Sequence, residues 1–112
     1  MLDKPEKTRE LVTELMAALP FEVELTPELI QLLRTQQPAI VVEPQQIVSK
    51  ISYAGDEGGI LCHIRPKETE NAIIISITHV RMDRKQPLGA AVFDYQKHRV
   101  KLLEKQRRAD LL

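Results

Sequence analysis

The chain has no tryptophan, one cysteine, two tyrosines and two phenylalanines among its 112 residues. With so few aromatic rings, there is little material for stacking on nucleic-acid bases or for anchoring an interface on a large side chain. The lone Cys62 has no partner for an internal disulfide, which favours a reducing compartment. A fold held together by internal disulfides is therefore excluded.

Long hydrophobic runs are also missing. Apolar stretches such as Ala72–Ile75 are far too short to span a bilayer, and Met1–Glu10 lacks the apolar segment of a secretory signal. Hydrophobic residues make up 43% and charged residues 29% of the chain, close to the averages for globular proteins. We therefore expect one cytoplasmic domain covering residues 1–112, with no membrane partner.

Charge is balanced overall but not along the chain. There are 16 basic and 16 acidic residues, so the net charge is zero. Residues 1–43 carry eight acidic and four basic side chains, whereas residues 83–112 carry eight basic and four acidic ones. This segregation favours attraction between the two ends, within one monomer or across a dimer. The alternative is a basic patch that binds nucleic acid.

A first helix is predicted near the N-terminus. Asp3 can cap it, Pro5 suits its first turn, and Pro20 ends it at Leu19. Its apolar residues recur with helical spacing and form one stripe that we assign to the core. They are Leu11, Val12, Leu15, Met16 and Leu19.

Two further helices have clear start signals. Thr26 is the expected N-cap of a helix that ends near Gln36, and Pro87 opens a long helix that continues to about Arg108. Between the first helix and Thr26, Phe21–Leu25 alternates apolar and acidic residues, a pattern that fits either a short edge strand or an extended connection. Ala39–Val42 is equally consistent with a strand and with a linker.

The stretch Ile47–Met82 predicts three strands joined by turns at Gly55–Gly59 and Pro66–Thr69. The first turn predicts the pairs Tyr53–Ile60, Ile51–Cys62 and Ser49–Ile64, and the second predicts Arg65–Glu70, Cys62–Ile73 and Ile60–Ile75. These pairs agree because they place apolar side chains on one shared face. That face comprises Ile47, Ile51, Tyr53, Ile60, Cys62, Ile64, Ile73, Ile75 and Ile77.

The opposite face of this meander is mixed. It gathers Lys50, Ser52, His63, Arg65, Ser76 and Thr78. Leu61 and Ile74 interrupt these polar side chains and are the candidate interface residues. After Ile77 the alternation fails, which indicates a bulge or the end of strand pairing.

No motif in the chain has the spacing of a known catalytic or metal centre. Cys62 and His63 are adjacent, so in a strand they point to opposite faces and form no catalytic pair. His79, Arg81 and Asp83 would share one face if the strand continued, which makes them a candidate ligand site, with Arg81 holding an anion. The alternative is a local His/Asp or Arg/Asp pair. We expect no cofactor, no metal and no catalytic residue.

The predicted last helix carries most of the basic residues of the C-terminal region. The candidate nucleic-acid contacts are Lys97, Lys101, Lys105, Arg107 and Arg108. Binding through them would depend steeply on salt concentration.

Three segments together resemble a small uncharacterised protein family of cyanobacterial type. They are GDEGGI (Gly55–Ile60), SITHVRMD (Ser76–Asp83) and PLGAAVFDYQKHRV (residues 87–100). The resemblance covers about the last two thirds of the chain. It implies no activity, cofactor or catalytic residue and is consistent with a cytoplasmic setting.

These observations predict an α+β fold. Its centre is a three-stranded antiparallel meander, extended by up to two short strands and packed on one face by two N-terminal helices and a long C-terminal helix. The favoured function is a non-enzymatic interaction or structural module that forms a homodimer through Leu61, Ile74 and the flank of the last helix. Weak nucleic-acid binding is the second hypothesis. A small ligand-binding protein or hydrolase using His79, Arg81 and Asp83 is the third.

Overall fold

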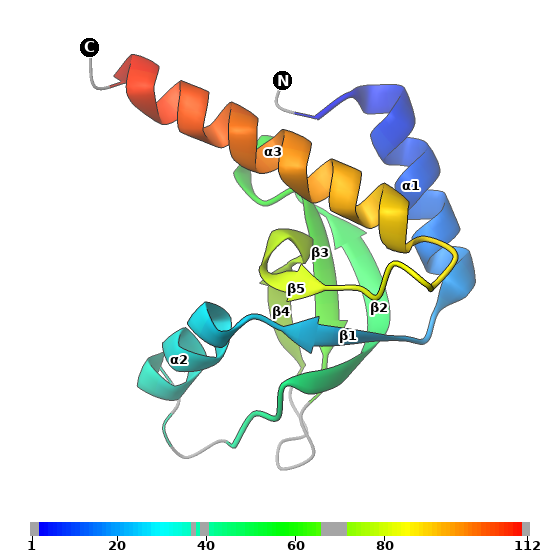
Figure 1. Cartoon of the computed structure of the whole chain (residues 1–112), viewed down its shortest axis with the longest axis vertical. Helices are drawn as coiled ribbons and strands as arrows, with labels where there is room; N and C mark the ends of the chain where they lie inside the picture. Colours follow the sequence, from blue (N-terminus) through cyan, green and yellow to red (C-terminus); the bar gives the residue numbers. More distant parts are fainter. Residues whose placement is uncertain (1–2, 37, 39–40, 66–71, 111–112) are drawn as a thin grey trace.

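The computed structural model describes residues 3–36, 38, 41–65 and 72–110, which form an α+β fold (Figure 1). Its helices are α1 (Pro5–Ala18), α2 (Pro27–Gln36) and α3 (Gly89–Asp110). Its strands are β1 (Phe21–Leu25), β2 (Gln45–Tyr53), β3 (Ile60–Ile64), β4 (Ile73–Ser76) and β5 (Val80–Arg81). Two short 3-10 helices are η1 (Gly55–Glu57) and η2 (Ile77–His79). The predicted fold class is confirmed.

The sheet is antiparallel and strongly curled. Its strand order is β4-β3-β2-β1-β5, so β4 and β5 lie at opposite edges although they are consecutive in the chain. Only η2, three residues long, connects them. So short a link can join the two edges only because the sheet curls until they approach each other, which produces a half-barrel.

Local sequence signals account for β1 and α2. β1 alternates buried and exposed side chains and lies between β2 and β5, so it is an interior strand and not the edge strand or connection considered from the sequence. Thr26 caps α2 as expected, because its Oγ1 accepts a hydrogen bond of 3.3 Å from the amide of Leu29. Val41 and Val42 lie outside any strand, while residues 39–40 fall outside the described part of the chain.

A bulge interrupts the β2–β3 ladder. Tyr53–Ile60 and Ile51–Cys62 pair as predicted, but Val48 and not Ser49 lies opposite Ile64. The extra residue is Ser49, and beyond it the side chains of β2 that face the core are shifted by one position. As a result, Val48 is fully buried and Ile47, which was predicted to face the core, is 52% exposed.

The predicted register between β3 and β4 is wrong by two residues. Cys62 lies opposite Ile75 and Ile64 lies opposite Ile73, whereas the sequence placed Ile73 opposite Cys62. A shift of two keeps each side chain on its face, because strand side chains alternate with a period of two. Ile75 and Ile77 are therefore buried as expected. The predicted pair Arg65–Glu70 lies partly outside the described residues.

One hydrophobic core fills the concave side of the sheet. α1 and α3 cover it from one end, and α2 packs its buried Leu29 and Leu33 into the same core at the other end (Figure 1). The predicted stripe of α1 is buried at Leu11 and Leu15, whereas Met16 is exposed. Among the described residues, no helix combines the length and the apolar character that crossing a membrane requires.

The start of α1 differs from the prediction. Its N-cap is Lys4, and no side chain caps it. Asp3 is instead buried and forms an ion pair with Arg99 of α3. This pairing of distant residues defines the polar centre of the protein.

Candidate functional site

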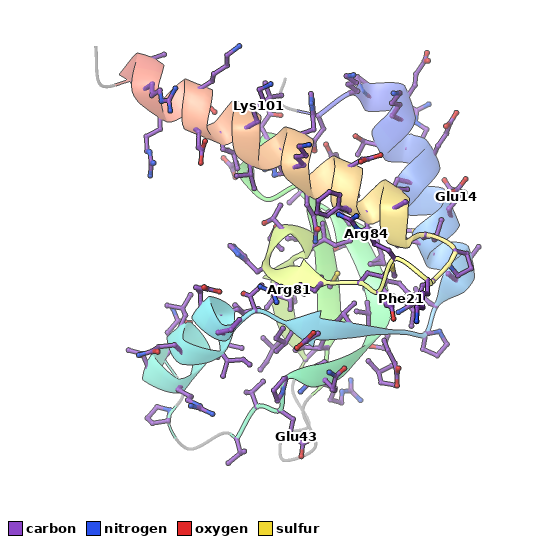
Figure 2. All side chains as sticks on the ribbon, in the orientation of Figure 1. Glu14, Phe21, Glu43, Arg81, Arg84 and Lys101 are labelled. Atoms are coloured by element: carbon purple, nitrogen blue, oxygen red, sulfur yellow. The ribbon has the colours of Figure 1, made fainter. Side chains whose placement is uncertain are left out.

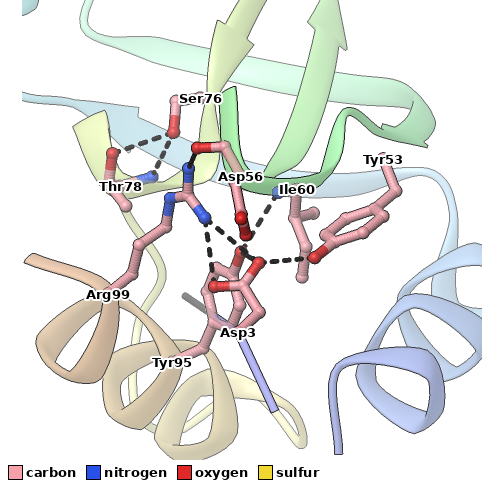
Figure 3. Close-up of polar contacts among 8 residues, drawn as sticks. All are labelled: Asp3, Tyr53, Asp56, Ile60, Ser76, Thr78, Tyr95 and Arg99. Carbon is pink, nitrogen blue, oxygen red and sulfur yellow. Dashed lines mark hydrogen bonds and ion pairs between the residues drawn. The ribbon is translucent and has the colours of Figure 1, made fainter. Parts of the chain in front are cut away.

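A polar cluster joins three parts of the chain (Figure 3); Asp3, Tyr95 and Arg99 at its centre are buried, whereas Tyr53 and Asp56 at its edge are exposed. We call it the Asp3 cluster and define it as Asp3, Tyr53, Asp56, Tyr95 and Arg99. Nη1 of Arg99 donates to both carboxylate oxygens of Asp3, at 3.0 and 3.1 Å. The hydroxyls of Tyr53 and Tyr95 donate to Oδ2 of Asp3 at 2.6 and 2.9 Å, and Nη2 of Arg99 donates to the carbonyl of Asp56 at 2.7 Å. The cluster therefore fastens the chain start, the β2–β3 turn and α3 together.

A glycine allows α3 to approach the β2–β3 turn. Gly59 has φ +66°, and a Cβ added there would lie 2.6 Å from the hydroxyl of Tyr95 and 2.8 Å from Nε of Arg99. The Tyr95 hydroxyl also accepts a 3.2 Å hydrogen bond from the amide of Ile60. Only a residue without a side chain fits both this backbone conformation and this contact.

The chemistry of the Asp3 cluster indicates a structural role. Asp3 and Arg99 are both only 3% exposed, so their charges depend on each other for compensation. Throughout the described residues, every buried side-chain nitrogen and oxygen atom has a hydrogen-bond partner. The Asp3 carboxylate already accepts four hydrogen bonds, so it is poorly placed to act as an acid or base on a substrate.

Both tyrosines of the chain respond to this carboxylate. Burial and, next, the hydrogen bond to Asp3 raise the pKa of Tyr53 from 10.0 to about 12. The same causes, in the same order, raise the pKa of Tyr95 even further. Removing the proton from either hydroxyl would place a second negative charge beside Asp3.

Cys62 and His63 point to opposite faces of β3. Cys62 is fully buried, and this burial raises the pKa of its thiol to about 12. His63 lies on the opposite face, where its Nε2 shares a 2.8 Å hydrogen bond with Oγ of Ser52. Desolvation and, next, the charge of Lys50 lower the pKa of His63.

The candidate ligand site His79, Arg81 and Asp83 is not on one continuous strand. His79 ends η2, Arg81 lies in β5, and Asp83 follows in the loop before α3. Arg81 and Asp83 line a shallow groove of about 780 Å³ together with Glu22 and Glu24, and His79 is not part of its lining. The acidic neighbours around Arg81 make this groove a poor anion site. Ligand binding here remains a prediction.

The candidate interface residues lie on the convex face of β3 and β4. Ile74 is 55% exposed and Leu61 is half-buried. Ile74 lies opposite His63, and Leu61 lies opposite Ser76. Two apolar side chains among polar neighbours make a small patch, which is a modest contribution to an interface.

The candidate nucleic-acid residues are all exposed on α3, and Lys101 points away from the sheet (Figure 2). Lys97, Lys101, Lys105 and Arg108 follow one another at spacings of three or four residues, so they share one face of the helix. Arg107 points to another side. The face is continuous but also carries Glu104.

Sequence reasoning missed the pairing of Asp3 with Arg99. The signal available was the position of Arg99 within the apolar stripe of α3, one helical turn after Tyr95 and in line with Val92. A charged residue on a buried stripe needs a buried partner of opposite charge. Among the described residues, no group of three or more His, Cys, Asp or Glu side chains could hold a metal ion.

Replacement of Gly59 by alanine tests the contact between the turn and α3. We expect Gly59→Ala to lower the free energy of unfolding by about 3 kcal/mol, because a positive φ costs about 1 kcal/mol and the clash adds about 2 kcal/mol. Gly55→Ala is the matched control, since Gly55 has φ +65° and open space around its Cα. It should cost only about 1 kcal/mol in urea denaturation. Equal losses in the two variants would contradict the close approach.

Titration of the tyrosines tests the Asp3 cluster. Because the chain has no tryptophan, its near-ultraviolet absorbance reports on these two side chains alone. We expect no tyrosinate signal at pH 10, with ionisation only near pH 12 and above. Since the folded pKa values are raised, these hydroxyls contribute stability that is complete below pH 10 and lost as the pH rises through the folded values. Asp3→Asn should move both transitions towards pH 10, and an unchanged titration in this variant would contradict the assignment.

Comparison with known proteins adds no assignment. The resemblance carried by Gly55–Ile60, Ser76–Asp83 and residues 87–100 therefore remains an expectation. Function has to be argued from the surfaces that the fold presents. No family model, no curated protein and no solved structure matches the chain.

Proposed function

We propose that this protein is a small non-enzymatic interaction module that associates with a second copy of itself, with α3 as the principal contact element. The observation that carries the proposal is the end of α3. The last buried residue of this helix is Arg99, yet the helix continues to Asp110. We call Leu103–Asp110 the arm, because every one of its residues is exposed and it extends beyond the rest of the molecule (Figure 1).

Exposed apolar side chains on α3 support the proposal. Phe93, Val100 and Leu103 are each between 39% and 44% exposed and lie on one flank of the helix. Arg84 packs its guanidinium 4.0 Å from the centroid of the Phe93 ring, so the start of this flank is already partly covered. Val100 and Leu103 remain open, and Leu61 with Ile74 adds a second small apolar surface. Surfaces of this kind gain stability when another protein covers them.

Three reactive side chains, those of Cys62, Asp3 and His63, also favour an interaction module over an enzyme. The Cys62 thiol is buried in apolar surroundings, and the Asp3 carboxylate is saturated by hydrogen bonds. His63 is engaged with Ser52. A catalytic site requires groups that are both reactive and accessible to substrate.

Sedimentation velocity tests self-association. The chain has a mass of 12.8 kDa, and we expect a species of twice that mass to dominate at micromolar concentration and to dissociate on dilution. A single species of monomeric mass across this range would contradict the proposal.

Nucleic-acid binding is a second candidate function, favoured by the alignment of Lys97, Lys101, Lys105 and Arg108 on one face of α3. If these four residues each contact a phosphate of duplex DNA, log K should fall with log salt with a slope of about −3.6. Lys101→Ala should reduce that slope by about 0.9, whereas Lys50→Ala on the convex face of the sheet should not change it. Absence of binding to a labelled duplex at low salt, measured by fluorescence anisotropy, would eliminate this candidate.

A further inference from the structure

A groove of about 380 Å³ runs between α1 and α3. Apolar atoms of Leu11 and Tyr95 contribute to its lining, while the exposed Glu10 and Glu14 of α1 line one side and Asp94 of α3 lines the other. Glu14 lies on the outer surface of α1 (Figure 2). The groove is therefore partly apolar inside and acidic along its rim at this end.

Basic residues line the other end of the same groove. Lys4 and Lys7 lie on its α1 side, next to Asp3, and His98 lies on its α3 side. Because Asp3 pairs with Arg99, this end is the one from which α3 continues into the arm. The charges of the groove are thus separated along its length, with the acidic part towards the start of α3.

The side of α3 that lines the groove has a charge pattern that inverts along the helix. Ala91, Asp94, His98, Lys101 and Lys105 recur at spacings of three and four residues and so form one stripe. Its first half carries the acidic Asp94 and lies in the groove, whereas its second half carries two lysines and continues towards the arm.

Such a stripe is complementary to itself when two helices run antiparallel. With His98 placed opposite its own counterpart, Lys101 lies near the partner's Asp94 and Lys105 lies near the partner's Ala91. The short side chain of Ala91 leaves room for the long lysine stem, whose charge then reaches the rim of the groove near the partner's Glu14. A two-fold axis repeats each of these contacts, so both arms and both grooves are used.

We infer that two copies of this chain pair through antiparallel α3 helices about a two-fold axis near His98, and that each copy places Lys101 and Lys105 into the acidic end of the partner's α1–α3 groove. This inference rests on the proposed self-association and places it on the groove side of α3. Phe93, Val100 and Leu103 lie on the opposite flank of the helix and stay outside this contact. Each copy contributes both an arm and a groove, so the dimer buries twice the surface of a single arm-in-groove contact. This brings the buried surface towards the roughly 800 Å² per partner of a stable complex.

The charges favour a second copy over a nucleic acid as the occupant of this groove. A phosphate backbone would meet Glu10, Glu14 and Asp94 at the rim, which repel it. A basic helix meets opposite charge there instead. The same chain carries both the basic helix end and the acidic groove, in the order that an antiparallel pair requires.

Charge reversal with complementation tests the inference. The first variant, Lys101→Glu with Lys105→Glu, has an acidic stripe that the acidic groove repels. The second variant, Glu14→Lys with Asp94→Lys, has a basic groove that repels the native lysines. We expect each variant alone to dimerise at least tenfold more weakly than the native chain. An equimolar mixture should form a heterodimer of native affinity, because the acidic stripe meets the basic groove at one contact and the native lysines meet the native acidic groove at the other.

The controls separate this geometry from self-association in general. Arg34→Glu with Lys50→Glu changes the net charge as the first variant does, at exposed positions on α2 and β2, and it should dimerise as the native chain does. Circular dichroism and thermal unfolding are used first to check that each variant folds. If the native chain dimerises but the charge variants dimerise equally well, the docking geometry is wrong and the self-association stands. If the native chain is monomeric, both are wrong.

Cross-linking provides a second measurement that does not depend on charge. His98→Cys places a thiol next to its counterpart at the two-fold axis, and the native Cys62 is fully buried and out of reach. Mild oxidation should therefore yield a disulfide-linked dimer of the variant. Arg34→Cys, at an exposed position on α2, is the control and should remain monomeric on a denaturing gel. Equal cross-linking of the two variants would overturn the inference.

Discussion

The buried ion pair between Asp3 and Arg99 is the interaction on which the arrangement of this protein depends. Removing two charges from water is costly, and the cost is offset only when geometry and hydrogen bonding are good. Here the Arg99 guanidinium donates to both carboxylate oxygens of Asp3 and to the Asp56 carbonyl. Two tyrosine hydroxyls also donate hydrogen bonds to the carboxylate. Since these groups come from the segment before α1, the β2–β3 turn and α3, the ion pair holds α3 and the start of α1 against that turn.

The curl of the sheet provides the second constraint on α3. The chain crosses from β4 to β5 through η2, and Nε2 of Gln96 donates to the carbonyls of Ile77 and Val80 on either side of that crossing, at 2.6 Å each. α3 is therefore held at Gln96 by the closing edge of the half-barrel and at Arg99 by Asp3. Beyond these two points the helix leaves the body of the protein. This explains why the arm is exposed although it continues a well-anchored helix.

The anchoring of α3 connects the fold to the proposed function. A helix fixed at two places keeps the spacing of its surface charges rigid, so Asp94, Lys101 and Lys105 are presented in a constant order. Rigid presentation reduces the entropy lost when a partner binds. The basic face serves two competing hypotheses, since Lys101 could meet either a phosphate or a carboxylate. The acidic rim of the adjacent groove is what favours a second copy of the chain.

Much of the local structure could be predicted from the sequence. The alternation of Phe21–Leu25, the cap at Thr26 and the glycine turn before Ile60 all depend on residues within a few positions of one another. Such short-range signals survive folding because the backbone conformations they favour are compatible with the final packing. The exposed lysines of α3 were also assigned correctly, since a helical face opposite the apolar stripe remains in water.

Other features were decided only by the tertiary structure. The register of β4 could not be read from hydrophobicity, because a shift of two residues leaves the same side chains facing the core. The bulge at Ser49 depends on how the strand bends, which its own pattern does not reveal. Asp3 had a local role available as a helix cap, but in the folded chain a buried Arg99 required an opposite charge more strongly than the helix start required a cap. By itself the sequence determined the helices and strands and their apolar faces. Only the tertiary structure decided which distant residues meet, because that choice depends on contacts between parts of the chain that lie far apart in sequence.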